Sequence, residues 1–449
     1  MRKGNRILSG LLALVMAAVM LLCPAEAITY EPDFTPTSKA VYLENLDTGL
    51  ILYEKNADEK MYPASLTKIM TAIVVLENVK DLDGETAEYP MWIQNMLYGT
   101  NASLGGLIVG EELTIRQLLT SALVQSGNES AMILAGYVGS GGMADFMPRD
   151  ITTFVEMMND KAKALGCTGT HFTNPTGLHS DNTYTTARDM AIMAKYAMQK
   201  SEFSSIVKNY AVQLGQTNKH ADLWQYSTNK MLLTSSPYYY APVVGIKTGS
   251  TDEAGRCVIS QAEDSGYHYF CVVMGSPVTA AEPYQNFIET RQLYRWAFGN
   301  FSLRTLLEQG ELMAEVPVKY SGDGKVAKLA IKEDVVQLLR DDISLDSIIY
   351  KAELPEFVEA PIEAGDTVGK MHIMLMGEEI GTVELVATQA FSLSWFRKAL
   401  GTIGSLLSST VAKVIFIVVV LAIAGYVVYA VRHNKKRKKH RSKYSDRNY

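Results

Sequence analysis

Near its N-terminus the chain reads Tyr62-Pro-Ala-Ser-Leu-Thr-Lys-Ile-Met-Thr-Ala72, the opening of an apolar run that continues to residue 79. A helix that is hydrophobic on most faces lies inside a protein, so we expect residues 65–79 to form a central, buried helix. Ser65 and Lys68 are three positions apart and would share one face of it. Burial lowers the pKa of a lysine, which can then activate a serine hydroxyl. The segment therefore predicts a nucleophile and its base.

Two later motifs carry chemistry of the same kind. Ser126-Gly127-Asn128 interrupts two predicted helices, 115–124 and 129–137, at a break where side chains can point into a cleft. Lys247-Thr248-Gly249 ends an apolar strand predicted over 243–248. An edge strand with Lys and Thr can pair with an extended peptide and hold its carboxylate, and Gly permits close backbone approach.

Each motif is weak by itself. The S-x-x-K spacing recurs at Ser205 and Lys208, and the S-x-N form recurs at 180–182 and 227–229. K-T-G occurs once. The three together, in this order, are typical of penicillin-binding proteins and class A β-lactamases. The combination predicts a serine acyl-transfer enzyme.

The sequence resembles the low-molecular-weight penicillin-binding proteins that are serine-type D-alanyl-D-alanine carboxypeptidases, over about residues 40–390. Further matching segments are 119–131, 174–178, 186–191, 227–233 and 245–255. The resemblance implies an α+β fold with a penicillin-binding-protein/β-lactamase-like transpeptidase domain, followed by a small all-β domain. A C-terminal transmembrane helix completes the predicted architecture.

The resemblance also implies roles for the first two motifs. Ser65 would attack the carbonyl between the last two D-alanines of a peptidoglycan stem peptide. Lys68 would take its proton and later activate the deacylating water. Ser126 would relay a proton to the leaving D-alanine, and Asn128 would bond the substrate amide and Lys68. β-Lactams would acylate Ser65.

For the third motif, the resemblance implies substrate binding. Lys247 and Thr248, with Gly249, would hold the carboxylate end, and the backbone N–H groups of Ser65 and Ser250 would form the oxyanion hole. No metal or organic cofactor is implied, and the seven His show no paired ligand spacing. Ser250 stands where many members have His or Phe.

A second departure lies in the predicted closing helix, 287–298. Many members carry an Arg ten residues before its Trp, here Trp296, to help hold the terminal carboxylate; this chain has Asn286.

The chain ends predict export and anchoring. Residues 1–27 read as a signal peptide with an A-x-A site, the alternative being an uncleaved anchor. The uncharged run 414–431 is close to the length of a membrane span, and the basic tail 432–449 after it stays in the cytoplasm. The protein is thus expected in the bacterial cell membrane, crossing it once, with its catalytic domain outside. The acidic body between the two ends argues against a nucleic-acid partner.

Composition divides the mature chain further. A hairpin at 40–46 and 50–55 and late strands at 257–262 and 269–274 should share one sheet in a catalytic domain, 28–300. Short apolar runs split by Gly-containing turns predict a β-rich domain over 305–388. Residues 389–413 form a juxtamembrane amphipathic segment, with an interfacial helix expected over 390–407.

Two other functions fit parts of the pattern. A class A β-lactamase would need a deacylating Glu in an E-x-x-L-N string, which is absent between Ser126 and Lys247. A non-enzymatic sensor of β-lactams or cell-wall fragments would need a signalling domain, and the 18-residue tail is too short for one. The carboxypeptidase reading is therefore the favoured one.

Overall fold

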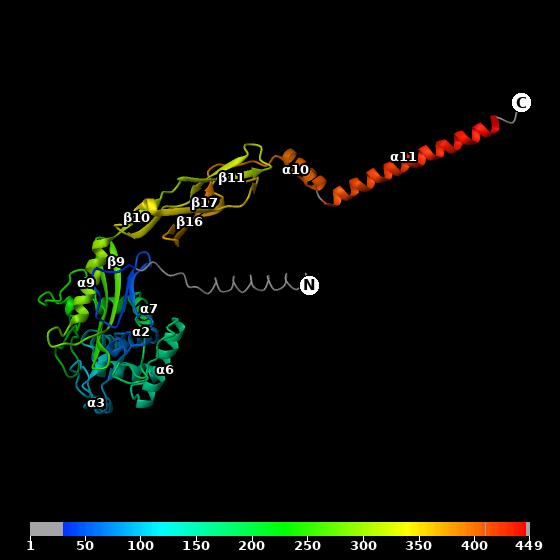
Figure 1. The fold of residues 1–449 in the computed structure, drawn as a ribbon. Helices are drawn as coiled ribbons and strands as arrows, with labels where there is room; N and C mark the ends of the chain where they lie inside the picture. Colours follow the sequence, from blue (N-terminus) through cyan, green and yellow to red (C-terminus); the bar gives the residue numbers. More distant parts are fainter. Residues whose placement is uncertain (1–29, 409, 446–449) are drawn as a thin grey trace, which may run out of the picture. The chain divides into compact units, whose positions relative to one another are not determined.

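The computed structural model describes residues 30–408 and 410–445; the predicted signal peptide, 1–27, lies outside them. The described chain divides into two compact units (Figure 1). The first holds the residues up to 303 together with 338–342, and the second holds 304–337 and the residues from 343 onward.

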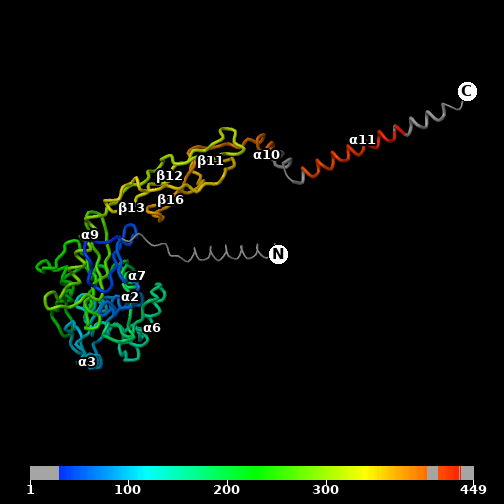
Figure 2. The backbone as a smooth tube through the Cα atoms, in the orientation of Figure 1, coloured from blue at the N-terminus to red at the C-terminus, as the bar shows by residue number. Residues whose placement is uncertain are grey.

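An antiparallel five-stranded sheet forms one layer of the first unit. Its strand order is β2 (Ile51–Lys55), β1 (Ala40–Asn45), β9 (Tyr267–Ser276), β8 (Gly255–Asp264) and β7 (Lys247–Thr251). The expected sharing of one sheet by the N- and C-terminal pieces is confirmed, because β1 pairs along its whole length with β9 (Figure 2, blue beside green). β7 lies at the edge, as the K-T-G motif predicted.

Helices cover this sheet. α9 (Gln285–Asn300) packs against β8 and β9, and α7 (Ala187–Met198) packs against β1 and β9. All residues of β9 from Tyr269 to Ser276 are buried, so this strand is covered on both faces.

The predicted central helix is present as α2 (Lys68–Asn78), and its first eight residues are buried. It packs against α7 and against two further helices, α5 (Asn128–Gly139) and α6 (Pro148–Ala164). The other elements of this unit are short: β3 (Thr86–Glu88), α3 (Met91–Leu97), β4 (Glu112–Thr114), α4 (Ile115–Thr120), α8 (Ser201–Val207), β5 (Ala211–Gln213), β6 (Trp224–Tyr226) and the 3-10 turn η3 (Lys230–Leu232).

Three elements differ from the sequence expectation at the motifs. Ser65 lies in a 3-10 helix, η1 (Ala64–Thr67), that precedes α2. The predicted helix 115–124 becomes a π-helical turn, η2 (Ser121–Gln125), over its second half. The predicted strand 243–248 becomes regular only at Lys247, because Gly245 has a φ of +119°. Hydrophobic periodicity cannot detect such local changes in backbone winding.

The second unit is a β domain, as predicted. A six-stranded sheet has the order β14 (Ile348–Glu353), β16 (Thr367–Leu375), β17 (Glu378–Ala387), β12 (Val326–Ile331), β11 (Leu312–Lys319) and β15 (Val358–Glu359). A separate pair of strands, β10 (Phe301–Leu307) and β13 (Val335–Arg340), contains residues assigned to both units, and the 3-10 turn η4 (Leu345–Ser347) precedes β14.

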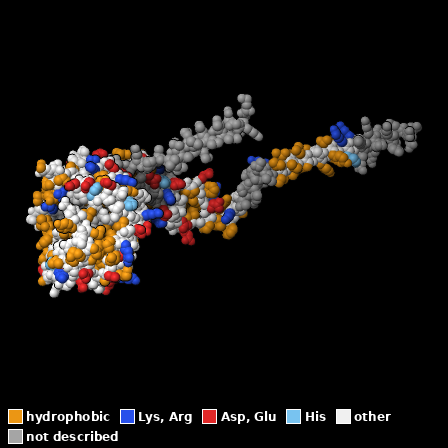
Figure 3. Space-filling model, turned by 90° about the horizontal axis from the view of Figure 1, so that it is seen from below, with side chains coloured by type: hydrophobic (Ala, Val, Ile, Leu, Met, Phe, Trp, Pro, Cys, Tyr) orange, Lys and Arg blue, Asp and Glu red, His pale blue; other side chains and the backbone are white. Residues whose placement is uncertain are grey.

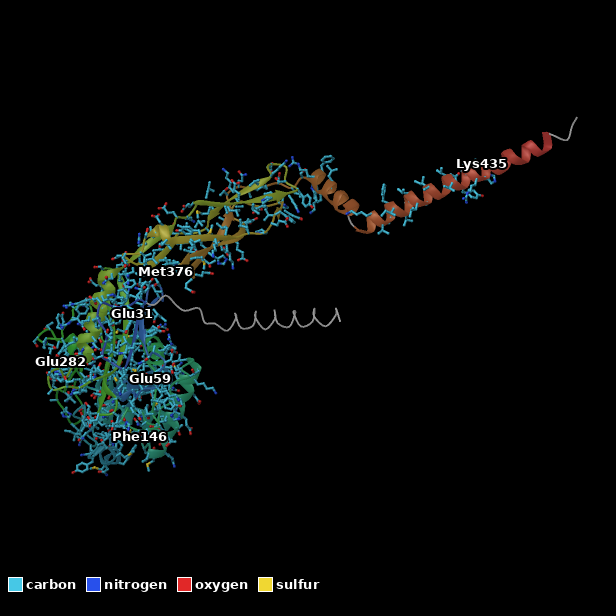
Figure 4. All side chains as sticks on the ribbon, viewed as in Figure 1. Glu31, Glu59, Phe146, Glu282, Met376 and Lys435 are labelled. Atoms are coloured by element: carbon cyan, nitrogen blue, oxygen red, sulfur yellow. The ribbon has the colours of Figure 1, made fainter. Side chains whose placement is uncertain are left out.

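Two helices end the described chain. α10 (Trp395–Ser408) begins five residues later than the helix expected from residue 390, because Phe391 is buried and bridges to Ile362 in the β domain. α11 (Thr410–Ser445) contains a stretch, Lys413–His433, that is long and apolar enough to cross a membrane. Figure 3 shows its apolar side chains followed by basic ones, and Lys435 lies beyond the apolar run (Figure 4).

Candidate active site

Ser65 and Lys68 meet at the junction of η1 and α2. The Nζ atom of Lys68 donates a hydrogen bond to the Oγ atom of Ser65 at 3.1 Å. In a 3-10 helix, side chains three residues apart are eclipsed, which brings this pair closer to alignment than a regular α-helix would. Ser65 is half-buried, whereas Lys68 is 1% exposed. The expected nucleophile and base are therefore adjacent, with the nucleophile facing outward.

The surroundings of Lys68 favour a neutral amine. Its Nζ atom also bonds the Oδ1 atom of Asn128 at 2.6 Å and the carbonyl oxygen of Thr176 at 2.7 Å. Burial holds the pKa of Lys68 well below its ordinary value, and the nearby charge of Lys247 lowers it further, while Glu129 opposes the shift. A neutral lysine can accept the proton of Ser65.

Ser126 lies at the break between η2 and α5, in the left-handed backbone region with a φ of 64°. Its Oγ atom accepts a hydrogen bond of 2.9 Å from the Nζ atom of Lys247, which also bonds the carbonyl oxygen of Thr248. Burial lowers the pKa of Lys247 to about 7. Ser126 and Lys247 therefore form a second hydroxyl–amine pair beside the first.

Strand β7 passes directly against η1. A Cβ atom at Gly249 would lie 2.9 Å from the carbonyl oxygen of Pro63 and 3.0 Å from the backbone nitrogen of Ser65. This is closer than real Cβ contacts, so the third residue of K-T-G has to be glycine. The Thr248 hydroxyl is hydrogen bonded to that of Thr228 at 2.6 Å.

A cleft of about 320 Å³ opens at these groups. Its lining includes Ser65, Ser126, Thr248, Gly249 and Ser250 from the three motifs. The remaining lining residues are Ser103, Thr228, Lys230, Arg256, Cys257, Tyr284, Asn286 and Phe287. The candidate residues Lys68, Asn128 and Lys247 are buried behind this surface. Lys247 is connected to the cleft surface through its hydrogen bond to Ser126.

Two supports were missed by the sequence reading. The first lies in the segment 174–178, to which the sequence assigned no role. There the Oδ1 atom of Asn174 accepts hydrogen bonds from the backbone N–H groups of Thr176 and Gly177. This turn aims the Thr176 carbonyl at Lys68. The second support is Glu129, one residue past the S-x-N motif, which is buried; its Oε1 atom accepts from the backbone of Gly105 at 2.6 Å, and burial raises its pKa.

The repeated motifs lie elsewhere or act differently. Ser205 is exposed on α8, and its hydroxyl bonds the carbonyl oxygen of Glu202 within the same helix. Within 227–229, Thr228 lines the cleft, while the side chain of Asn229 bonds the carbonyl oxygen of Gly245 and the backbone nitrogen of Met231. Tertiary structure therefore places the S-x-x-K motif of Ser65 at the cleft and its copy on the surface of α8.

A serine hydrogen bonded to a buried lysine, a second serine–lysine pair and an edge strand beside them are the arrangement expected of a serine acyl-transfer enzyme of the penicillin-binding type. The D-alanyl-D-alanine carboxypeptidase family matches residues 26–278, more than half of the sequence, and the chain belongs to this family. Residues 301–392 match the C-terminal domain of penicillin-binding protein 5.

Individual relatives agree with this assignment. The chain is 29% identical over 396 residues to the D-alanyl-D-alanine carboxypeptidase DacF of Bacillus subtilis, covering 86% of this chain and 95% of that one. The structure of penicillin-binding protein 5 from Haemophilus influenzae is 26% identical and superposes with a TM-score of 0.60, over 81% of this chain and all of that one. The DD-transpeptidase of Streptomyces K15 is 30% identical, with a TM-score of 0.54 over 59% of this chain and 98% of that one.

Proposed function

We propose that this chain is a serine-type carboxypeptidase that removes the terminal D-alanine from peptidoglycan stem peptides through an acyl-enzyme on Ser65. The proposal rests on the 3.1 Å hydrogen bond between Ser65, which lines the cleft, and the buried Lys68. The family assignment supplies the substrate class.

In the acylation step, Lys68 takes the proton of Ser65 as its Oγ atom attacks the carbonyl between the two D-alanines. The backbone N–H groups of Ser65 and Ser250 stabilise the oxyanion that forms. Strand β7 lies close to the backbone nitrogen of Ser65, since a Cβ atom added at Gly249 would be 3.0 Å from it. This closeness supports an oxyanion hole made from both segments. Thr248 and Gly249 on the edge strand pair with the extended peptide.

The leaving D-alanine needs a proton on its amine. Ser126 delivers it, and the 2.9 Å hydrogen bond to Lys247 lets that lysine reprotonate Ser126. Asn128 orients Lys68 through the 2.6 Å bond and is placed to bond the substrate amide. Before deacylation, Lys68 releases to water in the cleft the proton it took from Ser65, and Lys247 regains a proton from that water. The neutral Lys68 then takes a proton from the water that attacks the ester, and this proton returns to the Oγ atom of Ser65 as the acyl group leaves.

β-Lactams are proposed as covalent inhibitors, because their strained amide presents a carbonyl to Ser65 in the same way. A test incubates the full-length chain in detergent with a diacyl-L-Lys-D-Ala-D-Ala peptide and follows alanine release by mass spectrometry. Ser65→Ala should abolish both alanine release and covalent penicillin labelling, while the matched control Ser205→Ala should keep both. Labelling that persists in Ser65→Ala contradicts the proposal, and rapid β-lactam turnover with no alanine release indicates a β-lactamase.

We also propose that α11 anchors the enzyme, with its active site outside the cell and the tail from residue 432 inside. The apolar stretch Lys413–His433 and the basic residues after it support this orientation. α10, with Trp395 and Phe396 exposed, would lie on the outer membrane surface. In intact protoplasts, added protease should digest the catalytic domain and spare a tag fused after Tyr449; digestion of the tag overturns this orientation.

A further inference from the structure

The cleft beside Ser65 contains two cationic side chains that the proposed steps leave unused. Arg256 and Lys230 both line it. The guanidinium carbon of Arg256 lies 4.8 Å from the centroid of the Tyr284 ring, and the ammonium of Lys230 lies 4.4 Å from the same centroid. Among the described residues, no carboxylate forms an ion pair with either of them. This part of the cleft is therefore positively charged and uncompensated.

The guanidinium of Arg256 is also short of hydrogen-bond partners. Its Nε atom is buried and makes no hydrogen bond to any described residue. A buried donor without a partner is costly, and more so when it is charged. The guanidinium group has five donors in a planar fork that matches a carboxylate in two parallel hydrogen bonds. An anionic ligand in the cleft would satisfy these donors.

Strand register places Arg256 beside the expected substrate strand. Arg256 on β8 is the cross-strand partner of Ser250 on β7, and both line the cleft. The other candidate cation, Lys247, is buried and bonded to Ser126. Asn286, at the position where many family members carry an Arg, also lines the cleft, but it is neutral, and its buried Oδ1 atom has no partner among the described residues.

We propose that Arg256, assisted by Lys230, binds the C-terminal carboxylate of the peptide substrate and so restricts the enzyme to free C-termini. The guanidinium comes from strand β8, in place of the Arg that is missing at Asn286. This inference rests on the proposed carboxypeptidase function and names the specificity residue of that site.

The test compares diacetyl-L-Lys-D-Ala-D-Ala with the same peptide carrying a C-terminal amide, using the full-length chain in detergent. Arg256→Gln should lower kcat/KM for the free acid roughly 10- to 100-fold, the worth of a charge-assisted hydrogen bond, and change kcat/KM for the amide by less than about 3-fold. Lys230→Gln should give a smaller effect in the same direction. Arg295→Gln is the matched control, because Arg295 stacks on Tyr240 and does not line the cleft.

The acid-to-amide ratio is measured within one preparation, so a partly inactive variant does not disturb it. Adding Asn286→Arg to Arg256→Gln should restore much of the preference for the acid. Equal losses for acid and amide, or no loss for the acid, would overturn the assignment of Arg256.

Binding separates this inference from the proposed function. In the Ser65→Ala background, which cannot form the acyl-enzyme, calorimetry should show the free acid binding at least 10-fold more weakly when Arg256→Gln is added. Unchanged binding overturns the carboxylate site. If the unmodified chain releases no alanine while this difference is present, the proposed function fails and the carboxylate site stands.

Discussion

Replacing Lys247 by Met should make the catalytic domain more stable at neutral pH while disabling it. Lys247 is 1% exposed, and burial lowers its pKa from 10.5 to about 7. At about 1.36 kcal/mol per pKa unit, this shift means that burying the amine lowers the free energy of unfolding by about 5 kcal/mol at low pH. Met has a similar length and no charge, so Lys247→Met removes this cost.

The lost hydrogen bonds offset part of the gain. Lys247 bonds Ser126, which can turn to water in the cleft, and the carbonyl oxygen of Thr248. Leaving a buried acceptor without a partner costs about 1–3 kcal/mol. The net expectation at pH 7 is a stabilisation of about 2 kcal/mol, or about 4–8 °C in Tm for a domain of this size.

The sign of the pH dependence follows from linkage. Above the unfolded pKa of 10.5 both states hold a neutral amine, and as the pH falls toward 7 the unfolded state binds a proton that the folded state resists. Wild-type stability should therefore rise relative to Lys247→Met by about 3 kcal/mol between pH 7 and pH 9.5.

The assay is thermal unfolding of both full-length chains at the two pH values, followed by near-ultraviolet circular dichroism. The exposed Lys208→Met is the matched control and should show no such pH-dependent difference. Peptide turnover by Lys247→Met should fall about 10²- to 10³-fold, as expected for loss of a proton-relay partner. A Lys247→Met protein that is less stable at pH 7, or whose difference from wild type is the same at both pH values, refutes the reasoning.

Three further outcomes are expected. Gly177→Ala should slow penicillin acylation more than 10-fold and lower Tm, because its Cβ atom would lie 1.8 Å from the Ala64 carbonyl oxygen; Gly166→Ala, with a similar φ and open space, is the control. The kcat/KM for peptide should fall as the pH drops, since protonation of Lys68 removes the neutral amine that accepts the Ser65 proton, and a flat profile from pH 5 to 9 would contradict this. Glu129→Gln should move this acidic limb to lower pH, because Glu129 raises the pKa of Lys68, and a shift to higher pH would exclude that role.

The sequence by itself determined the architecture. The all-round apolar run after Ser65 required a buried helix, and α2 has its first eight residues buried. At the helix starts, Thr114 and Gln117 form a capping box before α4, and the Thr186 side chain caps α7. Binary patterns of this kind are local, so they can be read without knowing which segments meet.

The tertiary structure alone decided which groups share the cleft. The two copies of S-x-x-K are equivalent in sequence, yet only the packing of α2 buries Lys68 and lowers its pKa, while Ser205 is exposed. Arg256 gave no signal in the sequence, because its place beside Ser250 depends on the pairing of β7 with β8. A pKa and a cross-strand neighbour both depend on distances between segments far apart in the chain, and those distances exist only after folding.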